Sequence, residues 1–309
     1  MANLMLKKRC KQYILDVRNS WQLYTLILPA IVAVFIFHYL PIYGVQMAFK
    51  DYRNLLGIKG SEWIGFEHFQ KFITYPMFWS IVWNTIRISL YSMATFPCSI
   101  IFALMINELK NGVFKKTVQM LTYAPHFVST VVVASMLMLF LNRESGVINS
   151  IVAALGGKRL DYMGMPSAFS TIYVWSGVWQ ELGWGTIIYL AALSSISPEM
   201  IEAAKIDGAS RAQIVWHINL PFIMPTIVTL LILRTGSLLS VGFEKTFMLQ
   251  NSLNISASRV ISTYVYEVGL QNTQYSYSSA IGLFNNIINI LFILLINTVS
   301  KRVTEVGLW

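Results

Sequence analysis

Two groups of polar side chains interrupt an otherwise apolar sequence, and their types suit binding. The first is the segment at 202–221, "EAAKIDGASRAQIVWHINLP", whose charges can be presented to a partner. The second is Arg234, near the middle of the apolar run at 221–243, and charges inside a membrane are costly and tend to be functional. The sequence has no H-E-x-x-H, G-x-S-x-G or G-x-x-x-x-G-K-[ST] motif. The chain is therefore not predicted to be an enzyme, and it lacks the loop needed to hydrolyse ATP.

The composition indicates a polytopic membrane protein. Of the 309 residues, 12% are charged and 55% hydrophobic, whereas soluble domains are about 25% charged. The net charge of +9 is more typical of cytoplasmic loops and anionic lipid headgroups than of nucleic-acid binding, because no basic stripe with interleaved aromatics is present. Cys10 and Cys98 cannot form a disulfide framework or a metal site.

Apolar runs long enough to cross a bilayer predict six helices, since a span needs about 20 mainly apolar residues. The runs lie at 22–45, 79–107, 118–142, 171–194, 221–243 and 279–299. Lys and Arg are about twice as dense in the termini and the 108–117 and 195–220 loops as in the opposite loops. This bias predicts that both termini and the 195–220 loop are cytoplasmic. Two parts are expected, an amphipathic N-terminal segment at 1–20 and one membrane domain at 21–309. The N-terminal segment could instead be a frayed charged tail that only sets topology.

The 195–220 loop contains signals for two short helices. Ser197, Pro198 and Glu199 suit the start of a helix, and Gly208 suits its end because glycine readily adopts the left-handed conformation. Ser210 and Gln213 form a capping box for a second helix. Pro221 disfavours helix at the residue before it and can open the fifth span. The 195–220 loop could therefore present a helix to a partner, or it could form an amphipathic connection on the membrane surface.

The same loop resembles a known family motif. The "EAA…G…I-x-LP" pattern of ABC importer permeases is matched by Glu202, Ala203, Ala204, Gly208, Ile218, Leu220 and Pro221, and its extended form by Asp207 and Ala209. The resemblance covers nearly the whole chain, including "GWGTIIYLAALSSISPE" and "VGFEKTFMLQN". Within this family the chain is most similar to the sugar (maltose-type) branch and its LplB-like multiple-sugar or polysaccharide permeases.

The resemblance implies a specific architecture and set of partners. The fold would be an all-α, type I ABC importer permease with six transmembrane helices and a cytoplasmic coupling helix between helices four and five. The chain would sit in a bacterial cell membrane as a multi-pass protein, among lipid, with a second homologous permease as the expected heterodimer partner. Two cytoplasmic ATPase subunits would carry ATP and Mg²⁺, and an extracytoplasmic binding protein would deliver a sugar or oligosaccharide. Glu202, Ala203, Ala204, Asp207 and Gly208 would contact the ATPase.

A sugar cavity is expected among spans four, five and six, as the resemblance implies. Sugar sites combine aromatic faces with a few polar groups, and the candidates are Trp179, Glu181, Tyr189, Arg234 and Asn285. Alternatively, the aromatic residues belong to the interfacial belt at the membrane surface. Arg234 could bind an anionic sugar such as a uronate, line a cavity for a neutral sugar, or form a structural ion pair. Arg87, nearer the outer end of its span, is expected to snorkel to headgroups.

An ion-coupled secondary transporter of a small polar solute is the alternative function. It should show a buried acidic relay, an inverted repeat or a filter loop. No Asp or Glu lies in the middle of a predicted span, and no repeat is evident. Neither a metal site nor a nucleic-acid partner is expected.

Overall fold

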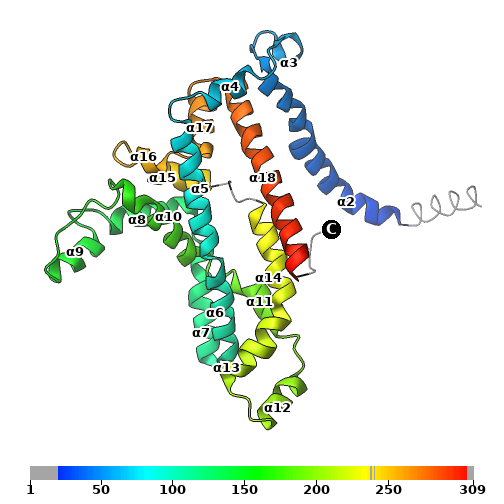
Figure 1. Ribbon diagram of the computed structural model, residues 1–309, viewed down its shortest axis with the longest axis vertical. Coiled ribbons are helices and arrows are strands. Elements are labelled where there is room, and N and C mark those ends of the chain that lie inside the picture. The colour runs from blue at the N-terminus through cyan, green and yellow to red at the C-terminus, as the bar shows by residue number, and fades with distance from the viewer. Residues whose placement is uncertain (1–19, 237–238, 240, 305–309) are drawn as a thin grey trace, which may run out of the picture.

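The computed structural model describes residues 20–236, 239 and 241–304, and this part of the chain is built almost entirely of helices (Figure 1). Up to residue 160 the elements are α2 (Trp21–Val34), η1 (Phe35–Tyr39), η2 (Leu40–Phe49), β1 (Lys50–Asp51), α3 (Gly57–Gly60), β2 (Glu62–Trp63), α4 (Glu67–Ile73), α5 (Phe78–Ala94), α6 (Phe96–Glu108), α7 (Val113–Tyr123), η3 (Ala124–Phe127), α8 (Thr130–Phe140) and α9 (Val147–Ala154). They continue with α10 (Pro166–Glu181), α11 (Thr186–Leu193), α12 (Pro198–Ile206), α13 (Arg211–Ile214), η4 (Val215–Asn219), α14 (Leu220–Thr235), α15 (Phe243–Leu249), α16 (Ile255–Ser258), α17 (Ile261–Tyr266), η5 (Glu267–Gln271) and α18 (Tyr275–Thr304).

Four helical segments in the described part of the chain are long and apolar enough to cross a membrane: Trp21–Phe49, Phe78–Glu108, Arg211–Thr235 and Tyr275–Thr298. Two bent pairs, Val113–Phe127 with Thr130–Phe140 and Thr186–Leu193 with Pro198–Ile206, raise the number to six if each pair is one span. Helices suit a bilayer because they satisfy every backbone polar group within the segment. The predicted all-α membrane fold is confirmed, although its third and fourth spans are not straight.

The predicted fourth span, 171–194, is divided between α10 and α11 at residues 182–185, and the bent pair that could form one span joins α11 to α12 instead. Gly183 lies in this break against the end of α7, where an added Cβ would overlap the backbone oxygen of Thr122. Gln180 Nε2 also donates a hydrogen bond to the carbonyl oxygen of Val128, 2.8 Å away. The junction of α10 and α11 is therefore packed on the end of α7 and on the bend of the third span at Val128.

Replacing Gly183 by alanine should destabilise the protein, because the new methyl group meets backbone that cannot move aside as a side chain would. Overpacking of this kind costs about 1–3 kcal/mol. A lower midpoint of thermal unfolding in detergent is expected. Gly282→Ala in α18 is the matched control, since its Cβ would meet no atom within 4 Å. Equal midpoints for the two variants would contradict the close packing at residue 183.

The predicted start and end of the fifth span are both wrong. One continuous helical segment runs from Arg211 to Thr235, and Leu220 has helical dihedral angles although Pro221 follows it. The π-helical turn η4 ends at Asn219, two residues before Pro221, and it covers the carbonyl four residues earlier with which a proline ring clashes. Wider π-type turns accommodate that defect without ending the helix. At the other end, α14 stops at Thr235 instead of residue 243.

The first short helix of the 195–220 loop is confirmed as α12, which projects at the foot of the molecule (Figure 1). Pro198 begins it, and Ser197 holds the N-cap position without a side-chain cap bond. Its end is fixed by two backbone bonds, from Gly208 N to Lys205 O (3.1 Å) and from Ala209 N to Ala204 O (2.9 Å). These bonds form a Schellman motif, which requires the φ of +82° found at Gly208. The capping box of Ser210 and Gln213 is also confirmed.

The opposite end of the molecule carries a small cap formed by β1, β2, α3 and α4 (Figure 1). β1 and β2 pair antiparallel, with Lys50 opposite Trp63. Phe72 of α4 is buried against Phe78 of α5, with ring centroids 4.9 Å apart, and both belong to an apolar cluster with Ile281 of α18. The cap is thus fixed to the ends of two spans.

The first helix of the first span, α2, points away from the other helices (Figure 1). None of the residues of α2, all of which the structure describes, is buried. The continuation of this span in η2 does contact α18. An apolar helix exposed on every side meets lipid or another membrane protein in the cell. The N-terminal segment at 1–20 lies outside the described residues except for Ser20.

Candidate functional site

A cavity of about 610 Å³ opens between α5, α6, α8, α10, α14 and α15. Its size falls within the usual range for small-molecule sites. The lining residues are Ser92, Thr95, Cys98, Ser99, Thr130, Tyr173, Val174, Gly177, Val178, Gln180, Glu181, Leu182, Arg234, Gly242, Phe243, Glu244 and Lys245. The wall thus combines hydroxyl groups with two cations and two carboxylates.

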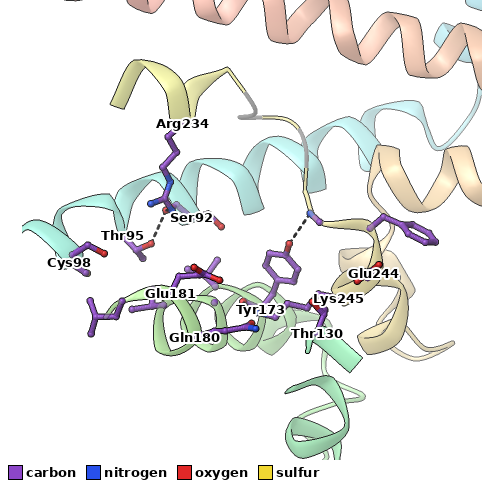
Figure 2. A pocket seen from close by; sticks show the side chains of 17 residues that line it. Ser92, Thr95, Cys98, Thr130, Tyr173, Gln180, Glu181, Arg234, Glu244 and Lys245 are labelled. Atoms are coloured by element: carbon purple, nitrogen blue, oxygen red, sulfur yellow. Dashed lines mark hydrogen bonds between the residues drawn. The ribbon is translucent and has the colours of Figure 1, made fainter. Parts of the chain in front are cut away.

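Arg234 extends from the last turn of α14 toward Ser92 at the end of α5 (Figure 2). Its Nη2 donates to the carbonyl oxygen of Ser92, 2.9 Å away, and its guanidinium carbon lies 5.7 Å from the centroid of the Phe96 ring. The backbone bond and the ring face orient the guanidinium at the cavity wall. A planar guanidinium is well suited to bind a carboxylate or sugar hydroxyl groups through several parallel hydrogen bonds.

Glu181 projects from the last turn of α10 (Figure 2) and forms a hydrogen bond with His126, which is not among the cavity-lining residues. Its Oε2 lies 2.9 Å from Nδ1 of His126, and the His126 ring stacks on Trp184 with centroids 4.2 Å apart and planes 3° apart. His126 belongs to η3, at the bend of span three. The pair therefore connects the cavity wall to the contact between the two broken spans.

Lys245 of α15 is a buried cation of the same cavity, only 8% exposed. Its Nζ donates to the carbonyl oxygen of Tyr173, 2.9 Å away, and lies 4.9 Å from the centroid of that ring. Burial lowers the pKa of Lys245 to about 8, an effect that the charge of Glu181 partly opposes. The side chain was not identified from the sequence, which placed it in an extracytoplasmic loop and gave no sign of its burial.

The five cavity candidates from the sequence occupy different surroundings. Glu181 and Arg234 both line the cavity. Tyr189 is 2% exposed within an apolar cluster of α6, α11 and α14, and Trp179 of α10 is 48% exposed. Asn285 of α18 is half-buried, and its side-chain oxygen has no hydrogen-bond partner among the described residues. The last three residues are not among those that line this cavity. Arg87, which is expected to snorkel to headgroups, donates to Ser170 Oγ of α10 at 2.7 Å.

The residues expected to contact a partner lie together on and just after α12. Glu202, Ala203, Asp207 and Gly208 are exposed, and Ala204 is half-buried. Ile201 packs on the apolar cluster that contains Tyr189, Leu193 and Ile223. One face of α12 is thus anchored to the spans, whereas Glu202 and the 86% exposed Ile206 face outward.

Residues 95–305 match the protein family described as "Binding-protein-dependent transport system inner membrane component". The chain belongs to this family. As such a permease it is a membrane subunit of an ABC importer and not an enzyme, which rules out the ion-coupled alternative. Within the described residues, no group of three or more His, Cys, Asp or Glu side chains could hold a metal ion.

The permease has similar relatives along its whole length. It is 42% identical to protein LplB of Bacillus subtilis, over 94% of this chain and 92% of that protein. It is 38% identical to the polygalacturonan/rhamnogalacturonan transport system permease protein YteP of Bacillus subtilis, over 100% of this chain and 96% of that protein. A solved bacterial alginate ABC transporter, in complex with an alginate pentasaccharide-bound periplasmic protein, contains a chain that matches with a TM-score of 0.87 and 39% identity, over 95% of this chain and 98% of that one.

Proposed function

We propose that the permease forms part of the path by which a bacterial ABC importer takes up an acidic oligosaccharide. The observation that carries this proposal is Arg234, a cation fixed at the wall of a large cavity between the spans. Carboxylates are the natural ligands of such a group, because the bonds between them are charge-assisted and directional. The relatives point the same way, since YteP is named for polygalacturonan transport and the matching structure imports the acidic polysaccharide alginate.

The other groups around the cavity suit a sugar ring. Ser99, Thr95 and Thr130 bring hydroxyl groups to the wall, and these can donate to or accept from sugar hydroxyls. Glu181 supplies a carboxylate that His126 holds at 2.9 Å. In this arrangement Arg234 binds a substrate carboxylate, while the remaining wall binds hydroxyl groups.

The path from the cavity to α12 is short. α11 begins five residues after Glu181, the last residue of α10, and it packs on α6 and α14 through Tyr189 and Leu193. The coupling helix follows α11 at a bend of 72° and docks through Glu202 to Gly208 onto an ATPase subunit. Closure of the ATPase dimer moves α12, and the packed side chains of α11 carry that movement to the cavity wall.

The assembly has the partners expected of an importer. A second, homologous permease completes the path, two cytoplasmic ATPase subunits hold ATP and Mg²⁺, and a binding protein delivers the sugar from outside. The chain itself binds no cofactor. The density of Lys and Arg favours a cytoplasmic location for both termini.

Purification in mild detergent tests this assembly. The permease should co-purify with an ABC ATPase and a second permease, identified by mass spectrometry. A chain that purifies alone and takes up sugar with a sodium or proton gradient, without ATP, would refute the proposal.

A further inference from the structure

Lys245 is a buried cation that lines the cavity and has few protein partners. Its ammonium group has three donors, and the described contacts use one of them, on the carbonyl oxygen of Tyr173. No carboxylate oxygen in the described part of the chain forms an ion pair with it. The face of the Tyr173 ring gives a further, weaker stabilisation at 4.9 Å.

Burying the ammonium group of Lys245 is energetically unfavourable. Removing an ammonium ion from water is unfavourable unless an anion or several hydrogen bonds replace the water. The low pKa of Lys245 reflects this burial. A methionine would fill similar space without the cost of burying a charge. Packing alone therefore does not explain why a lysine occupies this position.

The surroundings hold Lys245 in a fixed position. The hydroxyl oxygen of Tyr173 accepts a hydrogen bond from the backbone N–H of Gly242 at 3.0 Å, which fixes the start of α15 on α10. Gly177 leaves room on α10 beneath the ammonium, since an added Cβ there would lie 3.5 Å from Nζ. A preorganised cation loses little freedom when it binds a ligand.

We propose that Lys245 is a specificity-determining residue that binds a carboxylate of the transported oligosaccharide, at a point separate from Arg234. Arg234 comes from α14 beside Ser92, and Lys245 comes from α15 beside Tyr173 (Figure 2). Two cations on different elements can bind two acidic units of one chain, which a neutral oligosaccharide cannot exploit. This inference rests on the proposed function, since it assumes an acidic substrate.

Glu181 lines the same cavity as Lys245. The charge of Glu181 partly opposes the lowering of the Lys245 pKa. The Glu181 carboxylate lies 2.9 Å from Nδ1 of His126, however, and forms no ion pair with the lysine. The ammonium is therefore not neutralised by a direct protein contact among the described residues. An incoming carboxylate has room to bind it without first breaking a salt bridge.

Equilibrium binding to the complete transporter in nanodiscs tests the role of Lys245. The probes are trigalacturonate and its neutral methyl ester, with no binding protein present, so that protein's own selectivity plays no part. Lys245→Met should weaken binding of trigalacturonate by about 10- to 100-fold, the range expected for one hydrogen bond to a charged group. Binding of the ester should not change. Lys245→Arg should recover most of the loss, and Lys158→Met, an exposed lysine outside the cavity lining, should match wild type.

The possible results distinguish the role of Lys245 from the proposed acidic substrate. An equal loss for both probes would show that Lys245 only holds α15 on α10, and no loss for either would show that it does not touch the ligand. Either result overturns the inference. If the wild-type transporter itself fails to prefer trigalacturonate over the ester, the acidic substrate is wrong and the inference falls with it. Co-purification of the ATPase with each variant confirms that the complex is assembled.

Discussion

Replacing Gly208 by proline is expected to abolish ATP-driven uptake while leaving the permease in the membrane. The Schellman motif at the end of α12 needs the N–H of Gly208, which bonds to Lys205 O, and a φ of +82°. Proline has no N–H and fixes φ near −65°. The change therefore removes the stop of the coupling helix and redirects it, although the spans on either side are unaffected. Uptake by whole cells, with the amount of permease measured in isolated membranes, gives the result.

Two further variants show whether the geometry of α12 or its surface matters. Gly208→Asn should retain most of the activity, because asparagine tolerates the left-handed region. Glu202→Lys reverses an exposed charge without touching the fold and should weaken co-purification of the ATPase. Normal uptake and normal ATPase association in both Gly208→Pro and Glu202→Lys would show that α12 is an ordinary connection between spans.

Replacing Arg234 by alanine is expected to reduce uptake of an acidic oligosaccharide by about 10- to 100-fold, since a hydrogen bond to a charged group contributes about 1.5–3 kcal/mol. The guanidinium lies at the cavity wall, where Ser92 O and the Phe96 ring orient it. Uptake of a neutral oligosaccharide should fall much less. Both rates are expressed relative to wild type with the same binding protein.

Arg234→Lys is the matched control for the charge. It keeps the cation but loses the planar fork, so we expect partial recovery with the acidic substrate. An equal fall with both substrates would assign Arg234 a structural role between α14 and α5. Unchanged rates for both would remove the residue from the substrate path.

Features set by neighbouring residues could be predicted from the sequence. The start of α12 at Pro198, its stop at Gly208 and the capping box at Ser210 all depend on interactions within about four positions along the chain. The membrane fold also followed from the lengths of the apolar runs. These signals are local, so no tertiary information was needed.

Features set by packing between distant segments could not be predicted. The break at Gly183 exists where span four meets Thr122 of span three, and the sequence of either segment alone does not show that contact. Pro221 was read as a helix start because the π-helical turn that tolerates it has no clear sequence signal. Lys245 looks like any loop lysine until α15 is seen to fold back onto Tyr173.

In the function proposed above, ATP drives an acidic oligosaccharide through this permease. Its most direct test is uptake of labelled trigalacturonate into proteoliposomes that contain both permeases and the ATPases, with the binding protein outside. We expect uptake that requires both ATP and the binding protein. We also expect that Gly208→Pro abolishes that uptake and that Arg234→Ala strongly reduces it. Uptake without ATP, or of neutral oligosaccharides alone, would contradict the proposed function.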